Sequence, residues 1–273
     1  SCEVPITLTL ENKMNKTLGR IVPSILLFTF ALIQAQVVRS DHHEMAETSR
    51  VLQVYSCNYA KGKGAKDLAS AVSFWQTQMD KIDSKDMQNY FGATLTPISA
   101  NTDADFYWLG GSPNLNSFAR GGEAYSSSVA GQAADARFDK MSSCKSNLFF
   151  SEQIHAGMEP EEGNSDFVME AFGCTLKKGK TRANVSAAEG SYKAMYDALG
   201  LKVNVFRLAP FIANTAVDLY YFIAHDDMVA FGSNNTHMIT SKMGPAANGA
   251  LNQVMECKGG LYAGNIVHVP AGQ

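Results

Sequence analysis

The sequence predicts an α+β fold in which one β-α-β-β-α-β unit occurs twice in tandem. Three observations predict it: the two halves share matched landmarks, strand and helix periodicities follow the same order in each half, and four cysteines take equivalent places. The composition is that of a folded globular chain, because 45% of the 273 residues are hydrophobic and 18% are charged.

The first 40 residues have the features of a secretory signal. A run from Met14 places two basic residues before a short apolar core at 25–33. This core is shorter than the ~20 residues that a membrane-spanning helix needs, which makes a transmembrane anchor the weaker interpretation. We expect an upstream segment at 1–13, a signal peptide at 14–40 cleaved after Ser40 or, as a second choice, after Ala35, and a flexible tail at 41–50. The sequence thus predicts a periplasmic or secreted protein with no stable membrane anchor after cleavage.

Four cysteines remain beyond the predicted signal: Cys57, Cys144, Cys174 and Cys257. An even number in an exported chain favours two disulfides. The alternative is a zinc site of four thiolates, but no C-x-x-C pair is present. The formal net charge of −3 gives no support to a nucleic-acid partner.

Self-comparison identifies the repeat. Residues 51–75 align with 168–192 at an offset of 117 and share the signature C-x-x-x-K-G-K. The second half of the first copy aligns at an offset of 113. Matches there include Asp105 with Asp218, Tyr107 with Tyr220, Gly131 with Gly244, Cys144 with Cys257 and His155 with His268. We expect one copy at 51–158 and the other at 166–270.

Within the first copy, periodicity predicts the elements in order. A β-rich run at 51–57 is followed by helical spacing over 68–79, and 93–99 and 105–109 alternate like strands. A second helical region follows, with an expected break at Gly121 and Gly122 and a restart at 130–141. A last strand is expected at 148–155. The second copy repeats this order, and its first helix is expected to stop at Gly200.

This order is the split βαβ, or ferredoxin-like, arrangement, in which the first and last strands are antiparallel neighbours. The end of the first strand then lies beside the start of the fourth, where the cysteines of each copy stand. We therefore predict the disulfides Cys57–Cys144 and Cys174–Cys257. The competing connectivity joins the copies through Cys57–Cys174 or Cys144–Cys257.

Two such units in one chain resemble the dimeric α+β barrel superfamily over roughly residues 50–270. The resemblance rests on element order and duplication, and it implies that the two sheets pack as one intramolecular barrel. The stretch from Asp41 to His43, followed by a V-Y-S-C strand, is also similar to exported bacterial proteins of unknown function. Members of the superfamily include monooxygenases, haem-binding dismutases and ligand-binding sensors, but no catalytic motif here matches theirs.

Retained polar and aromatic residues supply the candidate ligand site. His155 and His268 each end the fourth strand of their copy, where they could bind ligand or serve as hydrogen-bonded structural residues. Aromatic residues at matched positions could line an apolar pocket between sheet and helix or could simply form core. These are Tyr55 with Phe172, Trp75 with Tyr192, and Tyr107 with Tyr220.

Metal sites have two weaker candidates. Cleavage after Ser40 would place His43 third in the mature chain, where the amine, two amides and the imidazole could chelate Cu(II) or Ni(II); a solvated tail is the alternative. His225, Asp226 and Asp227 with His237 form the second cluster, although either aspartate could instead cap a helix.

From these residues we expect an exported, disulfide-stabilised protein that binds a small, partly apolar ligand or an envelope partner without catalysis. The alternative is a monooxygenase-like oxidative enzyme that uses the aromatic pocket and one of the two strand-end histidines. An enclosed pocket with a buried histidine would favour the enzyme. The sequence does not specify a cofactor or an oligomeric state.

Overall fold

The structure of the chain is a computed structural model that describes residues 50–158 and 165–271. All of these fall within one compact unit, Met45–Gln273. The predicted upstream segment, the signal peptide and residues 41–49 of the tail lie outside the described residues. Within the described ranges, no helix combines the length and the apolar character needed to cross a bilayer.

The first repeat contains four strands and four helices. In chain order these are β1 (Arg50–Tyr59), α2 (Ala65–Met79), α3 (Lys85–Gln88), β2 (Phe91–Ser99), β3 (Phe106–Ser112), α4 (Leu115–Ser127), α5 (Val129–Asp139) and β4 (Ser142–Ala156). The second repeat has the same order with one helix fewer: β5 (Asp166–Leu176), α6 (Arg182–Leu199), β6 (Asn204–Ile212), β7 (Leu219–His225), α7 (Met228–Thr240), α8 (Met243–Asn252) and β8 (Met255–His268).

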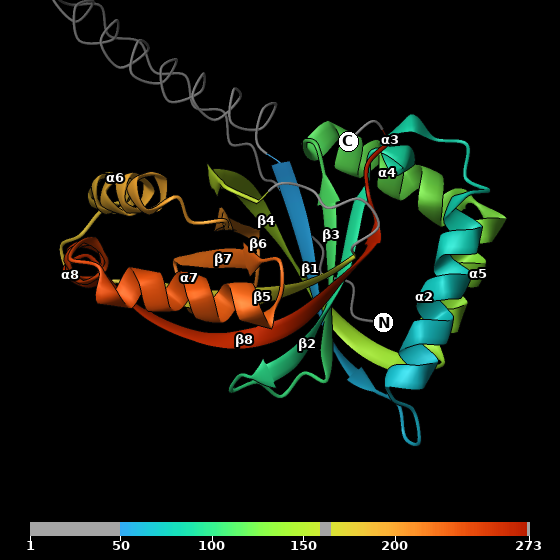
Figure 1. Cartoon of the computed structure of the whole chain (residues 1–273). Coiled ribbons are helices and arrows are strands. Elements are labelled where there is room, and N and C mark those ends of the chain that lie inside the picture. Colours follow the sequence, from blue (N-terminus) through green and yellow to red (C-terminus); the bar gives the residue numbers. More distant parts are fainter. Residues whose placement is uncertain (1–49, 159–164, 272–273) are drawn as a thin grey trace, which may run out of the picture. The chain divides into compact units, whose positions relative to one another are not determined.

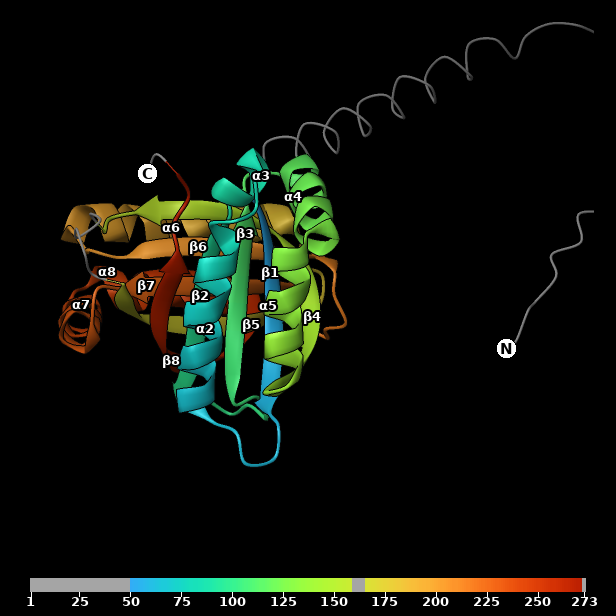
Figure 2. The same cartoon turned by 90° about the vertical axis from the view of Figure 1, so that its right-hand side faces the viewer.

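The eight strands close into one antiparallel barrel with the order β1-β3-β2-β8-β5-β7-β6-β4. Each repeat contributes four adjacent strands, and the repeats join where β2 pairs with β8 and where β4 pairs with β6. Helices α2 to α5 cover the barrel at the first repeat, and α6 to α8 cover it at the second (Figures 1 and 2). The predicted α+β class, with two tandem ferredoxin-like repeats packed as one barrel, is confirmed.

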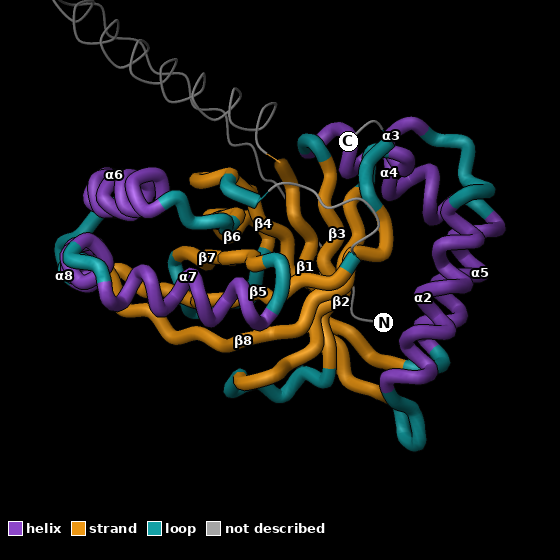
Figure 3. The backbone as a smooth tube through the Cα atoms, in the orientation of Figure 1, coloured by secondary structure: helices purple, strands orange, loops and turns teal. Residues whose placement is uncertain are grey.

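The fourth strand of each repeat reaches into the other repeat. The first part of β4 pairs with β1 and its last part pairs with β6, while β8 pairs with both β5 and β2. Figure 3 shows β8 as a long curved strand that runs beneath the second repeat toward β2. This double pairing explains why β4 begins at Ser142 rather than at the expected residue 148: the additional residues continue the ladder with β1.

The second helical region breaks at Ser128, so the expected break at Gly121 and Gly122 is wrong. Both glycines lie within α4. Ser128 adopts an extended conformation, and its hydroxyl accepts a hydrogen bond from Gly131 N at 2.8 Å, which caps α5. A Cβ at Gly131 would lie 2.1 Å from the Tyr125 carbonyl oxygen, and Gly244 has the same close approach in the second repeat. The matched glycines therefore allow the tight corner between two helices.

Both predicted disulfides form within their repeats. Cys57 pairs with Cys144 across β1 and β4, and Cys174 pairs with Cys257 across β5 and β8. The partners are directly opposite in the ladder, and each pair has a Cα–Cα distance of 4.1 Å. The alternative connectivity between repeats and the four-thiolate zinc site are therefore wrong.

The apolar core is divided into layers by the barrel wall. Side chains that point inward from both repeats pack together, with Leu95, Leu109, Phe149, Leu208 and Phe222 in one cluster. Side chains on the outer face pack beneath the helices of their own repeat in separate clusters. Strand alternation assigns neighbouring residues to different layers.

Candidate functional site

A cavity of about 720 Å³ lies between the sheet and the helices of the first repeat. Residues from β1, β3 and β4 form its sheet side, and residues from α4 and α5 cover it. Its volume falls within the range of roughly 300–1,000 Å³ that is usual for small-molecule sites. Eight aromatic residues line it: Tyr55, Trp75, Tyr90, Phe106, Trp108, Phe118, Tyr125 and Phe138.

The aromatic wall is held by ring contacts and one hydrogen bond. Trp75 and Trp108 meet edge to face with centroids 4.9 Å apart, and Trp108 makes a similar contact with Phe138 at 5.5 Å. The Trp108 indole Nε1 donates to the Tyr90 hydroxyl at 2.9 Å. A Cβ at Gly110 would lie 2.2 Å from that hydroxyl oxygen, so the glycine provides the space that Tyr90 occupies. The wall is therefore preorganised rather than formed from loosely packed side chains.

The polar groups of this cavity are acidic or neutral. Asp135 and Asp139 stand one helical turn apart on α5, and the Tyr125 hydroxyl donates to Asp135 Oδ1 at 2.9 Å. Burial against the cavity raises the pKa of Asp135, and the neighbouring charge of Asp139 adds to this effect. No lysine, arginine or histidine lines the cavity among the described residues.

The equivalent positions of the second repeat carry larger side chains. Ser112 corresponds to His225, which is 2% exposed, and Ser142 corresponds to Met255, which is 1% exposed. Gly121 corresponds to Asn234, whose side-chain amide nitrogen lies 3.3 Å from His225 Nδ1. Three positions that leave space in the first repeat are therefore filled in the second.

Other buried polar groups beneath the helices of the second repeat are also satisfied. His225 Nε2 lies 3.0 Å from Glu170 Oε1. Glu189 on α6 accepts hydrogen bonds from Arg207 Nη1 at 2.7 Å and from the Tyr221 hydroxyl at 2.6 Å. These ion pairs and hydrogen bonds link α6 and α7 to the sheet, and we assign them a structural role.

A second cavity, of about 740 Å³, lies in the barrel and is lined by both repeats. Tyr107 and Tyr220 occupy matched positions in it, and their hydroxyls are hydrogen bonded to Thr102 and Thr215. The Tyr107 ring also meets Tyr262 edge to face at 5.7 Å. Burial, with the nearby Tyr107, raises the pKa of Tyr262 to about 12, so the Tyr262 phenol stays a neutral donor or acceptor near neutral pH.

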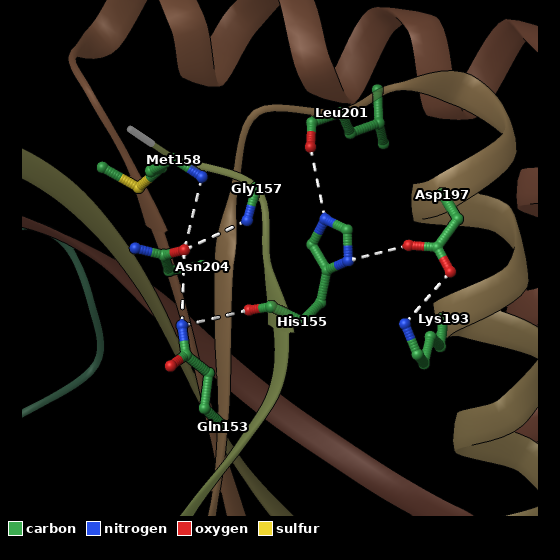
Figure 4. A network of polar contacts seen from close by, with 8 residues as sticks. All are labelled: Gln153, His155, Gly157, Met158, Lys193, Asp197, Leu201 and Asn204. Atoms are coloured by element: carbon green, nitrogen blue, oxygen red, sulfur yellow. Dashed lines mark hydrogen bonds and ion pairs between the residues drawn. The ribbon is translucent and has the colours of Figure 1, made fainter. Parts of the chain in front are cut away.

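His155 lies outside both cavities and connects the two repeats. It extends from β4 toward α6, where Nδ1 lies 3.3 Å from Asp197 Oδ1 and Nε2 lies 3.4 Å from the Leu201 carbonyl oxygen (Figure 4). Its ring also packs on Tyr196 with centroids 5.2 Å apart. With 8% exposure and contacts on both nitrogens, this histidine has the geometry of a structural residue.

His268 takes the reciprocal place at the end of β8, against the first repeat. Its ring meets Trp75 edge to face at 5.9 Å and lies 6.5 Å from Tyr90. Its Nε2 atom is buried and has no hydrogen-bond partner among the described residues. Burial lowers the pKa of His268 below its ordinary value, which favours the neutral ring.

The predicted ligand residues therefore do not form one site. Tyr55 and Trp75 line the first-repeat cavity, whereas Tyr107 and Tyr220 line the barrel cavity. Phe172 and Tyr192 pack with the core of the second repeat. The Tyr192 hydroxyl donates to Asn248, and burial raises the pKa of Tyr192 to about 12.

The cavity residues that the sequence reasoning missed had a detectable signal. The signal is a difference in side-chain volume at an aligned position, with a small residue in one copy and a large residue in the other. The pairs Ser112 with His225 and Ser142 with Met255 both show this difference. Comparing side-chain volume between the copies, rather than searching only for retained residues, would have indicated the cavity.

The two candidate metal sites have different outcomes. His43 lies outside the described residues. His225 contacts Glu170 and Asn234, and the Asp227 side chain caps α7 by accepting from Ala230 N. Within 50–158 and 165–271 there is no group of three histidine, cysteine or acidic residues arranged to hold a metal ion.

No family model matches the sequence, and no curated protein matches it. The fold is similar to that of solved structures. A "putative monooxygenase" of Fusobacterium nucleatum has a TM-score of 0.55 at 10% identity, covering 81% of this chain and 93% of its own. A "putative monooxygenase" of Lactobacillus acidophilus has a TM-score of 0.54 at 10% identity, covering 80% and 94%. The chain therefore has the dimeric α+β barrel fold, with both halves supplied by one polypeptide.

Proposed function

We propose that this is an exported binding protein that holds a small, partly apolar ligand in the first-repeat cavity without catalysing its conversion. One observation carries the proposal: an aromatic cavity exists beneath the helices of the first repeat, where the matched positions of the second are filled. The two disulfides agree with an oxidising compartment, and the predicted signal supports export to the periplasm or beyond.

The chemistry of the lining favours binding over catalysis. The histidines that the oxidative-enzyme hypothesis requires contact the other repeat and do not line the cavity. The serines along β4 lie beside a disulfide rather than beside a histidine base, which a serine nucleophile would need. The lining instead supplies aromatic surface with a few polar groups, as is usual for a site that only binds.

An apolar fluorescent probe, N-phenyl-1-naphthylamine, tests the proposal directly. We expect saturable binding of one probe per chain, detected as a rise in probe fluorescence. The variant Ser112→His/Ser142→Met carries the second-repeat residues at two positions of the cavity and should lose binding. Gly122→Asn places a single larger side chain in the cavity lining and should weaken probe binding. It should preserve folding, because a Cβ at Gly122 meets nothing within 4 Å.

Ala171→Leu is the matched control, since Ala171 lines the barrel cavity and its enlargement leaves the first-repeat cavity unchanged. Circular dichroism would confirm that each variant folds. Probe binding that survives both first-repeat variants but is lost in Ala171→Leu would contradict the proposal. Native mass spectrometry and an absorption spectrum of protein purified from the periplasm complete the test, because a bound haem, flavin or metal would favour the oxidative enzyme.

A further inference from the structure

We infer that the first-repeat cavity selects an organic cation, namely a protonated amine attached to an apolar or aromatic body. This inference rests on the proposed function, because it concerns the ligand class of the same cavity. It is carried by two separate features of the lining: the faces and edges of several aromatic rings, and two carboxylates on one helix.

The aromatic features come from three different elements. Trp75 on α2, Trp108 on β3 and Phe138 on α5 form a continuous series of edge-to-face contacts. The rings are inclined to one another by 73° and 75°, so in each contact the edge of one ring meets the face of the other instead of two faces lying parallel. An ammonium group is attracted to the negative face of an aromatic ring, most strongly to that of tryptophan.

The carboxylates supply the charge. Asp135 and Asp139 lie one turn apart on α5, and both line the cavity while keeping part of their surface in contact with solvent. The two basic residues at this end of α5 do not line the cavity: Lys140 is the C-cap residue, and Arg137 donates to Ser70 at 2.8 Å and lies over the Phe74 ring. The charge of the lining is therefore negative, and it complements a cation.

In the second repeat, acidic side chains beneath the helices are paired within the protein. There the acidic side chains beneath the helices contact groups of the protein: Glu189 pairs with Arg207, and Glu170 contacts His225. In the first repeat the corresponding positions hold Val72 and Gln53. The acidic side chains of the first-repeat cavity stand on α5 instead, where Asp135 contacts a neutral tyrosine hydroxyl. A cationic ligand would thus supply in the first repeat the positive charge that the protein supplies in the second.

Three ligands of similar size and different charge test the inference by isothermal titration calorimetry: 2-phenylethylamine, 2-phenylethanol and 3-phenylpropanoate. We expect the amine to bind about tenfold more tightly than the alcohol, and the carboxylate to bind more weakly than both. The variant Asp135→Asn/Asp139→Asn should remove the preference for the amine while leaving the affinity for the alcohol unchanged. Asp83→Asn removes one negative charge from an exposed site outside the cavity lining and should leave all three affinities unchanged.

Three results would overturn the inference. Equal affinity for amine and alcohol would show a cavity that does not select charge, and this outcome would leave the proposed function intact. An amine preference that persists in Asp135→Asn/Asp139→Asn would show that these carboxylates do not provide it. Failure of all three ligands to bind would also overturn it, and the neutral naphthylamine probe would then show whether the cavity binds any ligand.

Discussion

Removal of either disulfide should destabilise the protein by nearly the same amount. The two bridges join residues separated by 87 and 83 positions, so they close loops of almost equal length. In the chain-entropy treatment, loops of this length correspond to about 4.6 kcal/mol each, and the difference between the loops is below about 0.1 kcal/mol. This is a large fraction of the roughly 5–15 kcal/mol that stabilises a typical domain.

The perturbation is the replacement of both partners by alanine, as Cys57→Ala/Cys144→Ala in one variant and Cys174→Ala/Cys257→Ala in the other. Cys57 and Cys174 are both 1% exposed, so the packing lost at the buried partner is closely matched between the variants. The assay is urea unfolding followed by circular dichroism under non-reducing conditions. The free energy of unfolding should fall by about 4–5 kcal/mol in each variant.

A loss below about 1 kcal/mol in either variant would refute the argument that the bridge acts mainly on the unfolded chain. A difference between the variants of more than about 2 kcal/mol would refute the equivalence of the repeats, because loop length contributes almost nothing to such a difference.

Three further predictions concern individual side chains. Tyr90→Phe leaves the Trp108 indole without its acceptor and should lower the free energy of unfolding by about 1–3 kcal/mol, measured by urea titration. Glu189→Gln removes one of the two carboxylates that face Arg207, which keeps Glu152, and should cost about 1–3 kcal/mol in the same assay, whereas a change below about 0.5 kcal/mol would show that solvent and Glu152 compensate for the loss. Burial lowers the pKa of His268 below its ordinary 6.5, so the unfolded chain takes up a proton first and stability falls as the pH drops through this value. The melting temperature should therefore decrease less between pH 7.5 and 5.5 in His268→Phe than in the parent protein.

The fold could be predicted from the sequence because its main determinants are local or repeated. Hydrophobic periodicity identified the elements, and the matched cysteines reported which strands are neighbours, since the bridged residues stand directly opposite in the ladder. A glycine pair does not predict the helix break in this chain. The actual corner depends on the extended conformation of Ser128 and on the space at Gly131, neither of which periodicity encodes.

The candidate site was harder to predict because it depends on space rather than on retained chemistry. His155 and His268 are retained because each anchors the end of a long strand to the other repeat, so their conservation between the copies reflects a shared structural task. The sequence predicts Tyr55 and Trp75 as pocket residues, but it does not separate their cavity from the one that Tyr107 lines. Which side chains leave a space unfilled is a property of the packed structure.

The most direct test of the central claim is an amide chemical-shift map of the isotope-labelled protein titrated with N-phenyl-1-naphthylamine. The first-repeat cavity predicts shifts in β1, β3, α4 and α5, with Tyr55 and Trp108 among the residues affected, and little change at their counterparts Phe172 and Tyr221. Shifts of equal size in both repeats, or shifts confined to barrel residues such as Tyr107 and Tyr220, would contradict it.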